Sequence, residues 1–292
     1  VITELKDESN DVDYLDILTQ GEIPSDCDCL IITTLAQDLT ELESNTILNY
    51  INNGGKILML TSQNMLNIET PNFNKILEQY GVSIEYGAIL EQEGSKSLQN
   101  SPNTIIEDVS ASFMNKLDMK IKMCAINAGK INFADSDKLK ELGVTYETIA
   151  STSDKAFLRT NFNSASQTRT DEDKEEGSAI IGAYAKKKIS DDKTSKLIIY
   201  SNELFASDMT VSINAQYYTY ASELYNNKDI VLNSISHLTE RDDTITIRKT
   251  DESEKYTVSD QEDVIIKTII FVVPLIIILI GIVVWIFRRR KA

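Results

Sequence analysis

The sequence predicts a three-layer α/β fold with a mostly parallel sheet, followed by a single C-terminal transmembrane helix. Apolar, strand-like runs alternate with amphipathic helical segments, as expected when helices pack on both faces of a sheet. Residues 268–287 then form an unbroken apolar run, TIIFVVPLIIILIGIVVWIF, directly before four cations. We therefore divide the chain into an α/β domain (1–249), an acidic juxtamembrane stalk (250–263), the helix (264–287) and a basic tail (288–292).

A strand–helix–strand unit near the N-terminus is the strongest local pattern. Residues 29–35, CLIITTL, are apolar on both faces, which predicts a strand covered on both sides. Thr40 can cap the following helix, Glu43 completes a capping box, and Gly54–Gly55 end the helix. Residues 56–62, KILMLTS, form the next strand. Two strands joined through a helix predict a parallel pair.

The same alternation continues to residue 250, with antiparallel edges expected in the second half. Further helices are predicted at 71–80, 214–224 and 229–238. Further strands are predicted at 82–90, 119–126, 130–134, 144–152, 178–188, 196–202 and 244–250. Segments 91–103 and 164–177 are polar surface loops, and the second, SASQTRTDEDKEEG, is predicted to be mobile because it has almost no apolar residues. Its TDEDKEE stretch lacks the ordered alternation and the glycine of a calcium-binding loop.

The apolar run at 268–287 has the length needed to cross a bilayer as a helix. A buried core helix or the removable tail of a lipid-anchored protein could be equally apolar, but four terminal cations are typical of neither. The anchor residues that we single out are Ile269, Phe271, Pro274, Gly281, Trp285 and Phe287. The residues that set the topology are Arg288, Arg289, Arg290 and Lys291. Because cations favour the cytoplasmic side, we expect a single-pass protein of the cell membrane with its C-terminus cytoplasmic and its bulk extracytoplasmic.

The chain starts at Val1 and shows no signal peptide. A domain exported across a membrane needs an export signal. We therefore expect a cleaved signal, or a second, N-terminal transmembrane helix, upstream of this sequence.

Composition argues against nucleic acid as a partner. The chain has 45 acidic and 29 basic residues and a formal net charge of −16. An acidic surface repels phosphates, and solubility alone explains such a charge.

The cysteines and the histidine predict no metal site and no cofactor. Cys27 and Cys29 are separated by one residue at a strand start, so we expect their side chains on one face. Together with Cys124 they make an odd number, and His237 is the single histidine. Too few ligands are therefore available for zinc, and we interpret the three thiols as small buried residues.

No catalytic signature accompanies the strand–helix–strand unit. The sequence contains no G-x-S-x-G elbow, no G-x-x-x-x-G-K-[ST] phosphate loop and no G-x-G-x-x-G fingerprint. Ser62, Ser201 and Asn202 follow predicted strand ends, where open α/β sheets hold ligands. We expect turn or capping roles for them, and a protein that is not an enzyme.

Three segments resemble the GldG-like auxiliary proteins of ABC-2-type transport systems. They are IPSDCDCLIITTLAQDLTELESNTILNYINNGGKILML at 23–61, KLIIYSNELFASD at 196–208 and NNKDIVLNSISHLTERDDTITIRKT at 226–250. The terminal helix with its basic tail also fits this family, whereas residues 91–195 match only in outline. The matching motif positions are Ile23, Pro24, Asp28, Leu39, Thr40, Glu43, Gly54, Gly55, Lys56, Asn227, Asp229 and Arg248.

The resemblance implies a fold similar to flavodoxin-like or glutamine-amidotransferase-like domains, without their catalytic residues. It also implies a non-catalytic accessory subunit of an exporter, anchored in the lipid bilayer, with an ABC permease and an ATPase as partners. Two alternatives remain open on the sequence: a surface receptor or adhesion domain, and a degenerate hydrolase.

Overall fold

The computed structural model describes residues 1–61, 68–114, 120–174, 176–202, 204–214 and 217–241, together with Pro274 and Trp285. The chain divides into two compact units, Val1–Ile247 and Arg248–Ala292. The first unit contains all the strands given below.

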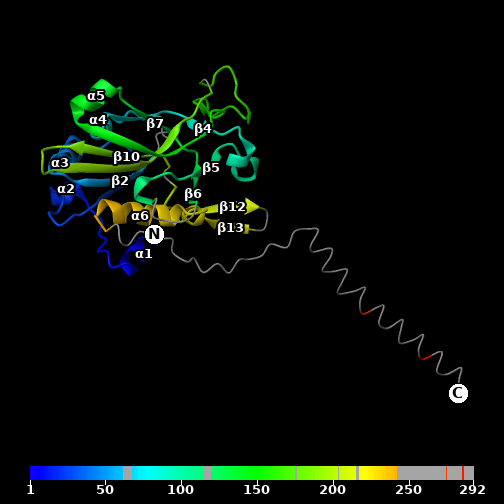
Figure 1. The fold of residues 1–292 in the computed structure, drawn as a ribbon, viewed down its shortest axis with the longest axis horizontal. Helices are drawn as coiled ribbons and strands as arrows, with labels where there is room; N and C mark the ends of the chain where they lie inside the picture. The colour runs from blue at the N-terminus through cyan, green and yellow to red at the C-terminus, as the bar shows by residue number, and fades with distance from the viewer. Residues whose placement is uncertain are drawn as a thin grey trace. The chain divides into compact units, whose positions relative to one another are not determined.

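The centre of the first unit is a seven-stranded mixed sheet (Figure 1). Its strands are β1 (Leu30–Thr33), β2 (Lys56–Leu60), β3 (Val82–Glu85), β7 (Lys130–Phe133), β8 (Val144–Ser151), β10 (Ile180–Lys188) and β11 (Thr194–Tyr200). The order is β1-β2-β11-β10-β7-β3, and β8 also pairs with β10. The pairs β1–β2 and β2–β11 are parallel. Every other pair in this sheet is antiparallel.

The prediction of a mostly parallel sheet was therefore wrong, and a flavodoxin-like sheet is not confirmed. Strand β11 is the cause. It adds to β2 in parallel, but only a short turn separates it from β10, so those two strands form an antiparallel hairpin. The antiparallel strand β10 consequently lies inside the sheet and not at its edge.

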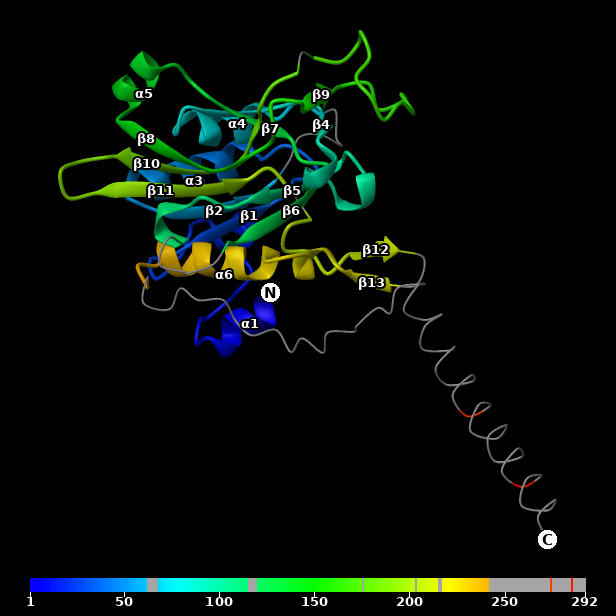
Figure 2. The same cartoon turned by 45° about the vertical axis from the view of Figure 1, so that its right-hand side comes forward.

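Helices cover both faces of the sheet, as the three-layer prediction required (Figure 2). Helices α3 (Glu41–Asn52) and α4 (Pro71–Glu78) pack on one face and α6 (Asn227–Leu238) on the other. The alternation of β2 shows the division clearly: Ile57 and Met59 belong to the cluster with α3 and α4, whereas Leu58 and Leu60 belong to the cluster with α6.

Strand β1 is covered on one face only, contrary to the prediction for residues 29–35. It forms the edge of the sheet, and Ile31 is 38% exposed while Leu30 and Ile32 are buried. Cys27 and Cys29 also differ from expectation. They precede the strand, so its two-residue period does not apply to them, and they pack on different clusters: Cys27 with the α3–α4 cluster and Cys29 with the α6 cluster.

Small sheets and short helices complete the described part of the first unit. The two-stranded sheets pair β4 (Ala88–Leu90) with β9 (Phe157–Arg159), β5 (Thr104–Asp108) with β6 (Lys122–Ile126), and β12 (Thr210–Asn214) with β13 (Tyr217–Tyr220). The remaining helices are α1 (Ile2–Asp7), α2 (Ile17–Gln20) and α5 (Ser136–Leu142). The 3-10 turns are η1 (Gly94–Lys96), η2 (Leu98–Asn100), η3 (Ser112–Met114) and η4 (Ala221–Glu223).

The helix predicted at 214–224 was wrong, because this segment contributes to the β12–β13 hairpin and η4. Its tyrosines favour a strand, where bulky aromatic side chains lose less rotamer freedom than in a helix. The helices predicted at 71–80 and 229–238 are confirmed as α4 and α6.

The predicted membrane anchor lies outside the described residues, apart from Pro274 and Trp285, which are helical and exposed. The strand predicted at 244–250 and motif position Arg248 also lie outside them. Among the helices that the described residues form, none combines the length and the apolar character needed to cross a bilayer.

Candidate functional site

Six motif positions from two separate stretches of sequence line one open pocket of about 660 Å³. They are Ile23, Pro24, Asp28, Gly54, Gly55 and Lys56. The first three come from the loop that leads into β1, the two glycines from the turn that joins α3 to β2, and Lys56 is the first residue of β2. The pocket therefore lies at the amino ends of two adjacent parallel strands.

Tyr50 joins the two walls of this pocket. Its hydroxyl lies 3.1 Å from the carbonyl oxygen of Cys27 and 3.2 Å from that of Lys56, and donates to them. Burial raises the pKa of Tyr50, so the hydroxyl keeps the proton that these contacts need. Tyr50 thus fastens the loop before β1 to the first residue of β2. The motif did not single it out.

The two glycines of the motif are explained by the turn and by Tyr50. Gly54 has a φ of +83°, a conformation that favours glycine after a helix. A Cβ on Gly55 would lie 2.3 Å from a ring carbon of Tyr50 and 2.6 Å from its carbonyl oxygen. Gly54 therefore allows the chain to turn after the helix, and Gly55 allows the backbone to pack closely against Tyr50.

Lys56 is used in an ion pair. Its Nζ lies 3.4 Å from Glu240, which also pairs with Lys196 at 3.1 Å. The hydrogen bond from Lys196 is the main reason that the pKa of Glu240 is lowered. Parallel sheets hold ligands at the carboxyl ends of their strands, the opposite edge from this pocket. The six positions thus form a structural joint, with an open surface that a partner could contact.

The motif positions at the start of α3 form the predicted capping box. Thr40 Oγ1 accepts from the backbone N–H of Glu43 at 3.2 Å, and Glu43 accepts from the backbone N–H of Thr40 at 2.8 Å. The carbonyl oxygen of Leu39 accepts from Asn72 Nδ2 at 2.8 Å. Asp38, which the sequence analysis missed, accepts from the first free N–H groups of α4 at 2.9 and 3.0 Å.

Asn227 connects the start of α6 to β6 and η4 through hydrogen bonds of its side-chain amide. Its amide donates to the carbonyl oxygens of Cys124 and Ala221, both at 2.9 Å, and accepts from the N–H of Cys124 at 2.8 Å. The side chain is buried, as is that of Asp229 in the same first turn of the helix. The three hydrogen bonds of Asn227 connect β6, η4 and α6.

The polar residues at the carboxyl edge of the sheet have structural partners. Ser201 Oγ donates to the carbonyl oxygen of Gly129 at 2.6 Å. Asn202 Oδ1 accepts from the N–H of Leu204 at 2.7 Å, which is the turn role predicted for it. Ser62 lies outside the described residues.

Cys124 is buried, as interpreted from the sequence, whereas Cys27 and Cys29 are only half-buried and Cys27 lines the pocket. His237 stacks on Phe113 with ring centroids 4.5 Å apart. Burial raises the pKa of Cys29 and of Cys124 to about 12, so these thiols stay protonated at neutral pH. Within the described part of the chain, no group of three or more His, Cys, Asp or Glu side chains could hold a metal ion.

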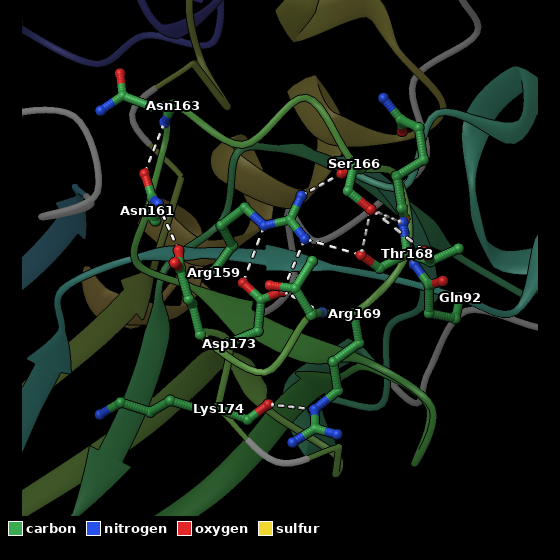
Figure 3. A network of polar contacts seen from close by, with 12 residues as sticks. Gln92, Arg159, Asn161, Asn163, Ser166, Thr168, Arg169, Asp173 and Lys174 are labelled. Atoms are coloured by element: carbon green, nitrogen blue, oxygen red, sulfur yellow. Dashed lines mark hydrogen bonds and ion pairs between the residues drawn. The ribbon is translucent and has the colours of Figure 1, made fainter.

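The acidic segment 164–177 is organised around one buried arginine (Figure 3). Arg159 Nε and Nη2 donate to the two oxygens of Asp173 at 2.9 and 2.8 Å. The same guanidinium donates to the backbone carbonyls of Ser166 and Thr168, the latter at 3.0 Å. The hydrogen bonds from Arg159 lower the pKa of Asp173 to about 2. The sequence analysis did not find this ion pair, and the mobility of the segment stays a prediction.

Comparison with solved structures supports the fold alone. One chain, described as "mmIFT52 N-terminal domain", is 14% identical with a TM-score of 0.53, covering 81% of this chain and 88% of that chain. Another, "Putative thua-like protein from Bacteroides uniformis ATCC 8492", is 11% identical with a TM-score of 0.38, covering 74% of this chain and 68% of that chain. This second likeness is too low to carry an argument. No curated protein matches the chain.

A protein-family model with the description "ABC-type uncharacterized transport system" matches residues 1–234. This range includes all the motif positions except Arg248, and it covers most of the chain. The match agrees with the resemblance found in the sequence. The chain therefore belongs to this family of ABC transport auxiliary proteins.

Proposed function

We propose that this protein is a membrane-anchored, non-catalytic auxiliary subunit of an ABC-type export system. The observation that carries the proposal is the family match over residues 1–234. Structural roles of several motif positions support it: Thr40 and Glu43 cap a helix, Lys56 forms an ion pair, and Asn227 makes buried hydrogen bonds. In this proposal the domain acts through protein contacts, and a separate ATPase supplies the energy.

We base the proposed anchor on the apolar run at residues 268–287 and on the four cations after it. One helical span of this length would hold the protein in the cell membrane. Arg288 to Lys291 would keep the C-terminus cytoplasmic and leave the α/β domain on the extracytoplasmic side. The permease is then the partner within reach of both the domain and the span.

Co-purification tests the proposal. The tagged full-length protein, extracted in mild detergent, should bring down a polytopic permease and an ATPase of the ABC type. A control that joins residues 248–292 to an unrelated soluble domain would separate capture by the anchor from capture by the α/β domain. Recovery of the full-length protein alone, under conditions that keep other ABC complexes intact, would contradict the proposal.

A further inference from the structure

Two exposed tyrosines share one face of the β12–β13 hairpin. Tyr218 and Tyr220 are 59 and 51% exposed. We call these two side chains the hairpin surface. Several other exposed large apolar side chains of the described chain lie on distant elements, such as Tyr146 on β8 and Phe162 after β9. Adjacent exposed rings mark a contact surface more often than scattered residues do.

Strand register explains why the tyrosines point outward. Tyr218 and Tyr220 pair with Ser212 and Thr210 and share one face of the hairpin. Val211 and Ile213 alternate with those partners, and they pack on the cluster of Ile106, Cys124 and Leu224 beneath the hairpin. One face of the hairpin is thus used in folding, and the other exposes the two tyrosine rings.

The hairpin has no charge. Residues 209–222, MTVSINAQYYTYAS, contain no Asp, Glu, Lys or Arg, in a chain of which 25% is charged. A partner recognised by ion pairs would require charges here. An uncharged surface with several tyrosines instead matches the headgroup region of a bilayer, where rings with an apolar body and a polar tip are enriched.

The hairpin and Arg241, the last described residue before the apolar run, lie on the same side of the sheet. In both views α1, α6, β12 and β13 lie on one side of the main sheet (Figures 1 and 2). Arg241, just after α6, donates to Asn10 Oδ1 at 2.8 Å and to the carbonyl oxygen of Glu8 at 3.1 Å. Residues 242–267 connect this point to the apolar run, and a chain of that length reaches at most about 90 Å. An anchor in the bilayer would therefore keep Arg241 within that distance of it.

We propose that the hairpin surface rests on the lipid headgroup region of the membrane that holds the anchor. This inference depends on the membrane anchoring in the proposed function. Because the surface is uncharged, a zwitterionic bilayer is sufficient and salt has little effect on the contact. The contact would orient the domain on the membrane.

Tryptophan fluorescence of the full-length protein in phosphatidylcholine vesicles tests this contact. Trp285 is the single tryptophan of the chain, so Trp285→Tyr gives a background without tryptophan. Tyr218→Trp in that background then reports on the hairpin. The matched control is Tyr146→Trp, which changes another exposed tyrosine. Tyr146 stacks on Phe133, which packs against the cluster on the α3–α4 face.

Bromines at shallow acyl positions should quench the emission of the Tyr218→Trp variant, because interfacial side chains lie at that depth. The emission of the Tyr146→Trp variant should not change. Equal quenching of the two variants, or none of either, would overturn the inference. So would a blue shift of the Tyr218→Trp variant that needs a co-reconstituted permease and occurs without lipid quenching, since the surface would then bind protein. Flotation of the protein with the vesicles reports separately on the anchor.

Discussion

At Gly55 the space for a single methyl group is already occupied by Tyr50. The Gly55→Ala substitution should therefore cost about 1 to 3 kcal/mol of unfolding free energy, the range found for overpacked sites. Gly177→Ala is the matched control, because nothing lies within 4 Å of the new carbon there. Urea denaturation of both variants gives the comparison. An equal loss of unfolding free energy in the two variants would mean that the turn at 53–56 can move to accommodate the added methyl group.

Asn227 offers a second test at the scale of one side chain. The Asn227→Ala substitution removes three hydrogen bonds and leaves buried backbone groups of Cys124 and Ala221 without them. Each such group costs about 1 to 3 kcal/mol, so we expect a loss of at least about 2 kcal/mol in urea denaturation. Asn132→Ala removes one partly buried bond to Glu85 and should cost much less. A near-neutral Asn227→Ala would show that water replaces the amide.

Sequence patterns identified several structural residues, but not the contacts that those residues make with other elements. The glycines, Thr40, Glu43 and Asn227 were singled out, and the capping box is confirmed, because its two members are three residues apart. Tyr50 and Asp38 were missed. Their partners come from other elements, Cys27 for Tyr50 and the start of α4 for Asp38, and no local pattern announces such contacts.

At the scale of elements, the 164–177 segment depends on the Arg159–Asp173 pair. The folded-state pKa of Asp173, about 2, lies below its ordinary value of 3.8. The pair therefore stabilises the fold fully above pH 4, and this contribution is lost as the pH falls through about 2. Asp173→Asn should cost about 3 kcal/mol at neutral pH, as for other buried pairs that lose one partner. The difference from the parent should shrink between pH 4 and 2.

Urea unfolding at several pH values measures this prediction. Asp191→Asn is the control, because Asp191 pairs with Lys188 in an exposed position. That variant should keep the stability and the pH profile of the parent protein. A constant difference between Asp173→Asn and its parent across pH 2 to 4 would contradict the assigned role.

Elements with a strong local period were predicted correctly, and those decided by tertiary context were not. Helix α4 and strand β2 carry clear patterns and were found. The helix predicted at 214–224 is wrong, because Tyr217 to Leu224 has few turn signals and the strand that pairs with β13 lies upstream. The exposure of one face of β1 could not be predicted from CLIITTL, because an apolar run does not show whether other elements cover both faces of the strand.

At the scale of the whole molecule, strand order was the feature that sequence could not supply. The predicted alternation led to a parallel sheet, whereas β11 enters beside β2 and makes its neighbour β10 antiparallel. That choice depends on contacts between residues about 140 positions apart, which no window of sequence contains. The three-layer prediction remains correct despite the different strand order, because it depends only on both faces of the sheet being apolar.

The proposed orientation in the membrane can be tested by changing the four C-terminal cations. Replacing Arg288, Arg289, Arg290 and Lys291 by alanine should produce molecules with mixed or failed insertion, since the proposed topology depends on these cations. Protease protection of a C-terminal epitope in cells measures the outcome. Lys255→Ala with Lys267→Ala, on the opposite side of the run, is the control and should keep the parent orientation. An unchanged topology after loss of the four cations would contradict the assignment.

The contacts of Arg241 with Glu8 and Asn10 also decide how the domain bears a mechanical load. If a transporter moves the anchor, tension along residues 242–267 arrives first at Arg241. The two hydrogen bonds there join segments more than 230 positions apart in the chain. A pull would therefore be shared between the end of α6 and the segment that follows α1, and would not act on the last turn of α6 alone.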